Sequence, residues 1–153
     1  MISKQELREW LTDHKHNPKN IQHETLDYGF EIRRGSIRMV IGQAKEKDYL
    51  HIETLVQLPP EEEQYYNPEK DEDFKRKVVK HYPSFTIDIA YIEGSGVRVY
   101  DKVFHNGFDL GRLFRSIRAV TYTALFLWNL LRVTVGLGTY QEDVQQTNLS
   151  YYS

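Results

Sequence analysis

Apolar residues recur along this chain with two spacings, one typical of helices and the other typical of strands. The helical spacing of three and four residues predicts three helices, at 3–14, 67–82 and 109–135. Alternation of apolar and polar residues predicts five strands, at 26–34, 37–41, 50–56, 85–91 and 97–103. The order α-β-β-β-α-β-β-α predicts an α+β domain whose antiparallel sheet is packed by the N- and C-terminal helices.

Capping residues stand at the predicted start of each helix. Ser3 and Glu6 have the spacing of a capping box, in which each side chain satisfies a backbone donor near the other. Asn67 followed by Pro68 is typical of a helix start, and Asp109 is the expected N-cap of the last helix. Without an internal repeat or a linker, we expect a single domain over 1–136 and a polar C-terminal tail over 137–153.

The last predicted helix is apolar on more than one side. A rotation of about 100° per residue places one apolar stripe toward the sheet, consisting of Leu113, Ile117, Val120, Ala124, Leu127 and Leu131. The side away from this stripe carries a second apolar set, consisting of Tyr122, Leu125, Phe126, Leu130 and Val133. A helix that is apolar all round needs cover on both sides. We therefore expect the second set to form a homodimer interface; the alternative is that the first helix or the tail covers it.

Charge limits the kinds of partner that this chain attracts. Twenty basic and 22 acidic residues leave a formal charge of −2, so the protein as a whole has no field that draws it to nucleic acid or to an anionic membrane. The last helix nevertheless offers a candidate local basic patch, formed by Arg112, Arg115 and Arg118. Three arginines near the first hairpin would enlarge this patch: Arg33, Arg34 and Arg38. Tyr28 and Tyr100 would then supply aromatic rings on which the bases of single-stranded RNA stack.

The chain has no cysteine among its 153 residues. This excludes disulfides, thiol catalysis, cysteine zinc sites and iron–sulfur clusters, and it favours a reducing compartment such as the cytoplasm. Residues 1–6 do not resemble a secretory signal, and the most apolar stretch, 119–131, is too short to span a membrane. We therefore expect a cytoplasmic protein.

Histidines and carboxylates offer two weak candidates for chemistry. His14, His16 and His23 could together hold a metal ion, but they have no fixed spacing, and exposed histidines are the simpler interpretation. Asp101 and His105 could form a carboxylate–imidazole pair, yet no nucleophile motif accompanies them. We therefore predict no enzyme activity, no cofactor and no metal.

Three segments resemble a known family. They are the helix segment 7–11 (Leu-Arg-Glu-Trp-Leu), the strand residues Tyr28, Phe30 and Ile32, and the segment 103–108 before the last helix. With the order of elements, they resemble an uncharacterised, mainly archaeal family with the type III secretion chaperone-like (YbjN-like) fold. The resemblance covers about residues 3–135.

The resemblance implies a homodimer that binds segments of other proteins, and it supplies no catalytic residue. We therefore predict a non-enzymatic protein-interaction module, for which chaperone-like action is a candidate role. The alternative is a module that binds RNA or single-stranded nucleic acid through the arginine patch.

Overall fold

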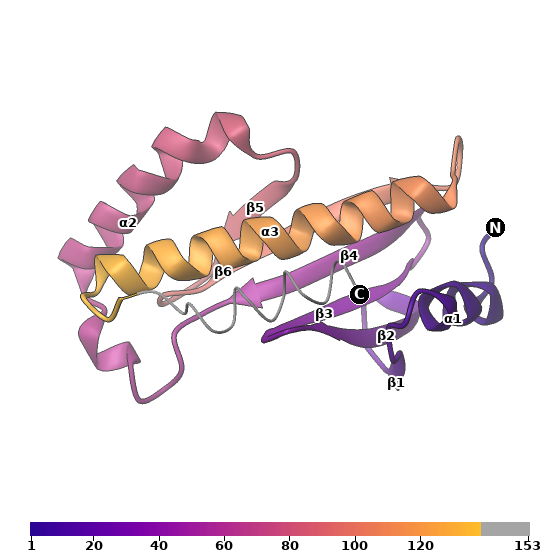
Figure 1. Ribbon diagram of the computed structural model, residues 1–153, viewed down its shortest axis with the longest axis horizontal. Coiled ribbons are helices and arrows are strands. Elements are labelled where there is room, and N and C mark those ends of the chain that lie inside the picture. The colour runs from indigo at the N-terminus through magenta and orange to yellow at the C-terminus, as the bar shows by residue number, and fades with distance from the viewer. Residues whose placement is uncertain (139–153) are drawn as a thin grey trace.

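The computed structural model describes residues 1–138. The helices are α1 (Lys4–Asp13), α2 (Pro68–His81) and α3 (Leu110–Thr134), with short 3-10 turns at Glu63–Tyr65 and Tyr82–Ser84. The strands are β1 (Lys19–Ile21), β2 (Leu26–Arg34), β3 (Ile37–Ala44), β4 (Tyr49–Val56), β5 (Asp88–Tyr91) and β6 (Val97–Phe104). Figure 1 shows α3 running the length of the molecule across the sheet. The prediction of an α+β fold with an antiparallel sheet is confirmed.

All six described strands form one antiparallel sheet in the order β1-β2-β3-β4-β6-β5. The meander β2–β3–β4 and the hairpin β5–β6 were predicted, and β4 joins the two through its pairing with β6. The edge strand β1 was not predicted, because Pro18 and polar neighbours give it no alternating pattern. The strand predicted at 85–91 is also shorter, since the turn at Tyr82–Ser84 delays its start to Asp88.

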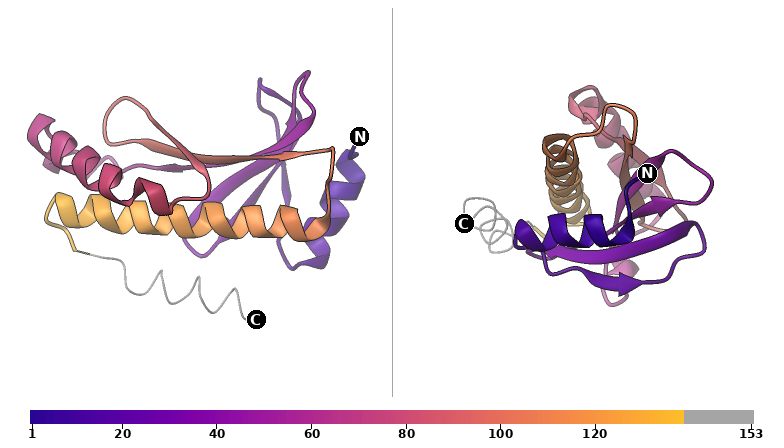
Figure 2. Two further views of the ribbon diagram at one scale, coloured as in Figure 1. Left: turned by 90° about the horizontal axis from the view of Figure 1, so that it is seen from above. Right: turned by 90° about the vertical axis from the view of Figure 1, so that its right-hand side faces the viewer.

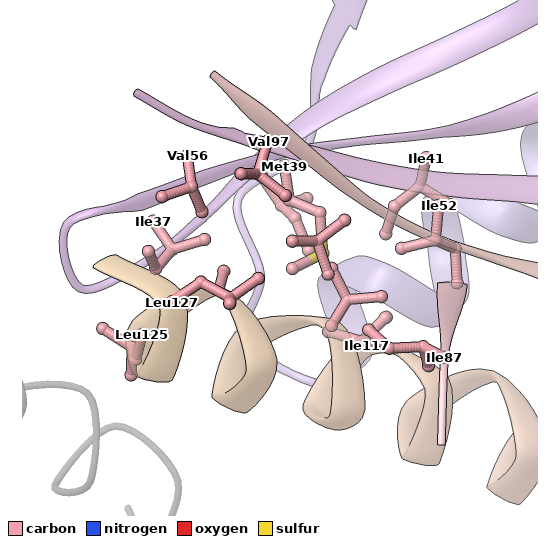
Figure 3. Close-up of a cluster of buried hydrophobic side chains, with 14 of the residues drawn as sticks. Ile37, Met39, Ile41, Ile52, Val56, Ile87, Val97, Ile117, Leu125 and Leu127 are labelled. Atoms are coloured by element: carbon pink, nitrogen blue, oxygen red, sulfur yellow. The ribbon is translucent and has the colours of Figure 1, made fainter. Parts of the chain in front are cut away.

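The core lies between the sheet and the inner stripe of α3. Every residue of the predicted stripe is buried, from Leu113 at one end to Leu131 at the other. Figure 3 shows Ile117 and Leu127 rising from α3 toward sheet residues such as Met39 and Ile52. The helical period and the strand alternation thus agree on one apolar layer, as a stable α+β domain requires.

The predicted caps are present at the three long helices. Ser3 and Glu6 form the complete capping box of α1. The side chains of Asn67 and Asp109 accept backbone hydrogen bonds from the first turns of α2 and α3, at 2.9 and 2.8 Å. The boundaries of these helices therefore follow from local sequence.

The two shorter helices pack against opposite ends of α3. Near its start, Trp10 of α1 stacks on Phe108, with ring centroids 5.4 Å apart. Figure 2 (right) shows α1 crossing the sheet beside α3, which is seen end-on. Near its end, Lys77 of α2 donates a hydrogen bond to Thr134 at 3.3 Å. Within residues 1–138, no helix is both long and apolar enough to cross a lipid bilayer.

Candidate functional site

The outer side of α3 presents a narrow apolar stripe. Tyr122, Phe126 and Val133 are 41%, 38% and 50% exposed. Their spacing of four and seven residues keeps them within about 40° around the helix axis. We call Tyr122, Phe126 and Val133 the outer stripe.

The segment around α2 covers one flank of the outer stripe. Phe126 makes edge contacts with His81, at 4.9 Å between ring centroids, and with Phe85, at 5.9 Å. Phe85 in turn contacts Tyr82, which is itself exposed. The covers considered from the sequence were a second copy, the first helix and the tail, and they did not include this segment, which lies against the Phe126 flank. The aromatic surface of α3 continues instead onto the end of α2.

Two of the five residues predicted for this interface lie deeper than expected. Leu125 is only 5% exposed, and Leu130 is half-buried against the core. Around the helix axis, Leu125 and Leu130 lie on either side of the outer stripe. Neighbouring elements therefore cover them more easily than they cover the stripe itself. Leu125 is therefore corrected to a buried residue, whereas Tyr122, Phe126 and Val133 remain at the surface.

A cavity of about 760 Å³ opens where β3 and β4 separate. Their ladder ends at the pair Met39–Thr54, although β3 begins at Ile37 and β4 continues to Val56. Beyond that pair, β3 remains paired with β2, whereas the end of β4 remains paired with β6. The two strands diverge, and the cavity occupies the resulting gap. We call it the split groove.

The split groove has apolar walls and a basic rim. Its lining includes Leu55, which is 49% exposed, together with Trp128 of α3 and the dipeptide 59–60 (Pro-Pro). Arg33 and Arg38 stand at the rim, on the two strands of the β2–β3 hairpin. No lining residue described for this cavity is acidic. The groove therefore suits an apolar ligand that carries negative charge.

The sequence contained a signal for this groove that the predictions did not use. Leu55 occupies a position in β4 whose neighbours on the same side of the sheet are the polar residues His51 and Glu53. An apolar residue at the solvent side of an alternating strand, followed by two prolines, indicates an exposed apolar spot at a strand end.

The sheet face away from α3 holds a cluster of ionisable side chains. Glu53 Oε1 accepts hydrogen bonds from His51 Nε2, at 3.1 Å, and from Arg98 Nε, at 3.0 Å. Burial acts to raise the pKa of Glu53, but these hydrogen bonds and the charge of Arg98 outweigh it and lower the pKa to about 2. A carboxylate with so low a pKa is a weak base at neutral pH, so the cluster is poorly suited to proton transfer. Its hydrogen bond from Arg98 to Glu53 instead links β6 to β4.

The three histidines considered for a metal do not come together. His14 stacks on Phe114 of α3 at 3.6 Å between ring centroids, and His16 lies at 6.2 Å from the same ring. The ring of His23 instead accepts a hydrogen bond from the backbone of Thr25. Among the described residues, no group of three His, Cys, Asp or Glu side chains could hold a metal ion.

The candidate pair Asp101–His105 does not form. Asp101 accepts a hydrogen bond from Ser116 of α3 at 2.6 Å, whereas His105 bonds to the buried side chain of Gln43 at 2.7 Å. The two residues are four positions apart, so strand alternation alone would place them on one face, but β6 ends at Phe104 and the turn that follows brings His105 to Gln43. Each side chain has a separate structural partner, so the candidate carboxylate–imidazole pair is absent.

The predicted arginine patch separates into two groups. Arg112, Arg115 and Arg118 are exposed on the first half of α3, and Arg112 donates to the backbone carbonyl of Lys102 at 3.3 Å. Arg33 and Arg38 instead line the cavity beside Trp128, which follows Arg118 by 10 residues and Arg112 by 16. At 1.5 Å per residue, these separations are about 15 Å and about 24 Å along the helix, so the two groups of arginines do not form one continuous patch.

Tyr28 and Tyr100 do not share a surface either. Tyr28 donates to the backbone carbonyl of Ile2 at 2.7 Å, and burial raises the pKa of its phenol to about 12. Tyr100 lies on the open sheet face, stacked on His51.

Solved structures share this architecture. No family model matches the sequence, and no curated protein matches it. The fold is that of the type III secretion chaperones: a chain from the crystal structure of the ExsC–ExsE complex aligns with a TM-score of 0.54 and 11% identity, over 86% of this chain and 97% of that chain. An uncharacterized protein from Methanothermobacter thermautotrophicus aligns with a TM-score of 0.74 and 20% identity, over 87% of this chain and 99% of that chain. The predicted resemblance in fold is confirmed.

Proposed function

We propose that this protein is a non-enzymatic protein-interaction module that forms a homodimer through the outer side of α3. The observation that carries the proposal is the outer stripe, in which three large side chains lie on one line of a helix and remain at the surface. Water-exposed apolar stripes on a folded domain are typical of association sites. A second copy would cover the stripe by an isologous contact, the commonest arrangement in homodimers.

The fold supports a role in binding another protein. The related chain of known structure was crystallised in a complex, ExsC with ExsE. We infer by analogy that this module also binds a segment of a partner, with chaperone-like action as the specific form. The non-enzymatic part of the proposal rests on the ionisable cluster of the open sheet face, where Glu53 is already engaged by His51 and Arg98.

Molar mass by light scattering tests the homodimer. At tens of micromolar, we expect twice the 18.2 kDa of one chain. Phe126→Asp should convert the dimer to a monomer, because the carboxylate would be buried without a partner in the interface. A matched control is Phe104→Asp, since Phe104 is equally exposed but lies on β6. A wild-type monomer under these conditions would rule the dimer out, and dissociation by both variants would remove its assignment to α3.

One observation favours nucleic-acid binding as a second candidate. Arg112 bonds to the backbone of Lys102, whose ammonium lies 5.1 Å from the centre of the Tyr49 ring. Tyr49 makes an edge contact with the exposed ring of Phe104, so cations and aromatic faces meet at one end of the sheet. Single-stranded nucleic acid is bound by this combination in other proteins.

Fluorescence anisotropy with a labelled oligouridylate tests this candidate. Binding should weaken steeply with salt and after joint replacement of Arg112, Arg115 and Arg118 by Ala. Absence of binding at low salt would exclude it, as would binding that the triple replacement leaves unchanged.

A further inference from the structure

We propose that the split groove binds an extended segment of a partner protein in which a carboxylate stands beside a large apolar side chain. This inference rests on the proposed interaction function and assigns it a second surface, separate from the outer stripe of α3. Three properties of the groove point to this ligand: its shape, its apolar walls and its charge.

The shape of the groove favours an extended backbone. Ile37 and Arg38 of β3 face Leu55 and Val56 of β4 across the split, and the ladder between the two strands does not include them. Diverging strand ends offer backbone donors and acceptors along a line, which is how sheets capture added strands. A segment entering here would continue the direction of the strands and form hydrogen bonds with the diverging ends.

The walls of the groove fit large apolar side chains. Leu55 is about half exposed, whereas Ile37 and Val56 are buried at the floor, where they join the core cluster. Figure 3 shows Ile37 and Val56 together at one end of that cluster, above Leu127. The 760 Å³ volume holds several side chains, so one apolar anchor and its neighbours fit within it.

The rim determines the charge of the ligand. Arg38 Nε already binds Glu31 at 2.7 Å, and the side chain of Arg33 has no ion pair among the described residues. With no acidic residue in the lining, a carboxylate from outside is the complementary group. The arginine guanidinium binds a carboxylate in a bidentate geometry, through two parallel hydrogen bonds. Such a contact fixes the orientation of the carboxylate as well as attracting it.

Selection from a phage-displayed library of random short peptides tests the proposal on the full chain. We expect the selected sequences to combine Asp or Glu with Leu, Phe or Trp one or two positions away. Fluorescein-labelled synthetic copies should then lose about tenfold in affinity with Arg33→Glu and with Leu55→Ser, as measured by anisotropy. Both replaced side chains are exposed, so the variants should fold; circular dichroism checks this.

Matched control variants are Arg76→Glu and Val79→Ser on α2, which make similar changes at exposed positions away from the groove. They should leave the affinity within a factor of about two. Equal losses in the controls and the groove variants would overturn the proposal, as would selected peptides that are basic.

Other occupants give distinct results that would also overturn it. Affinity that rises in Glu142→Lys would indicate competition from the chain's own acidic C-terminal segment. Affinity that falls as the protein concentration rises would indicate a second copy in the groove. Peptides that bind but respond only to Phe126→Asp would leave the interaction function intact and remove its assignment to the split groove. A library that yields no binder for the folded chain would contradict partner binding altogether.

Discussion

The two sides of α3 carry apolar side chains of comparable size in different surroundings. On the inner side, Val120 and Leu127 are fully buried against the sheet. On the outer side, Phe126 makes ring contacts with His81 and Phe85 but is still 38% exposed, and Val133 is half exposed. Spacing along the helix therefore identifies an apolar stripe, whereas the layer that covers it decides whether the stripe is core or available surface.

The largest expected effect comes from the inner side. Leu127→Ala should lower the free energy of unfolding by about 3 kcal/mol, because it removes buried methyl groups and leaves a cavity. Denaturant unfolding at a concentration where the protein is monomeric measures the loss. If Val133→Ala lowers stability equally under those conditions, the distinction between the two sides fails.

The next effect concerns the loop that forms one wall of the split groove. Arg132 of α3 binds Glu62 at 2.7 Å in a largely buried ion pair and also donates to the backbone carbonyl of Gly138 at 3.1 Å. Arg132→Met should lower the free energy of unfolding by about 2 kcal/mol, because the Glu62 carboxylate would lose its buried partner.

A matched exposed pair gives the control for this ion pair. Arg76 and Glu72 lie 3.3 Å apart on the surface of α2. Arg76→Met should change the free energy of unfolding by less than about 0.5 kcal/mol. Similar losses for Arg76→Met and Arg132→Met would show that burial does not set the strength of the Glu62 contact.

Acid should weaken the contact between α1 and the start of α3. Burial, together with the smaller effects of the charges of Arg34 and His14, lowers the pKa of His16 to about 4. Since the imidazole takes up its proton more readily when unfolded, stability is complete above pH 6.5 and falls as the pH decreases toward 4. The slope in this window is at most about 1.4 kcal/mol per pH unit.

A His16→Gln variant isolates this dependence. Its unfolding free energy should vary less between pH 6.5 and 4.5 than that of the wild type. Glu53, with a pKa of about 2, contributes to the pH dependence only below about pH 4.5, so it does not interfere. Parallel pH profiles for the two proteins would exclude His16 as the source.

The smallest effect on stability belongs to the outer stripe. Val133→Ser should change the free energy of unfolding of the monomer by less than about 0.5 kcal/mol, because the side chain is already half in water. The same change should weaken self-association, measured as a shift of the mass transition in sedimentation toward higher concentration. A large loss of monomer stability would place Val133 in the core instead.

Local patterns determined most of the fold. The caps at Ser3, Asn67 and Asp109 and the inner stripe of α3 depend on residues three or four positions apart, which a sequence displays directly. Strand β1 could not be predicted, since its three residues are held by pairing with β2 rather than by a pattern of their own. The order of elements, together with the segments 7–11 and 103–108 and the strand residues Tyr28, Phe30 and Ile32, also indicated the chaperone-like fold.

The candidate sites depend on contacts between distant parts of the chain. His105 contacts Gln43, which lies 62 positions earlier in the sequence, and α2 places His81 against Phe126, which lies 45 positions later. The split groove arises because β4 follows β6 at its end while β3 follows β2. No spacing in the sequence encodes these contacts. The pattern around Leu55 indicates an exposed apolar spot, but the groove itself, the arginines beside it and the burial of Leu125 required the structure.

Thiol labelling of Val133→Cys tests the central claim most directly, because the chain has no other cysteine. If the outer stripe forms the homodimer interface, the labelling rate falls with rising protein concentration in proportion to the fraction of monomer. Lys47→Cys, in the exposed β3–β4 turn, serves as the control and should react at a constant rate. A rate for Val133→Cys that is equally fast and independent of concentration would contradict the account.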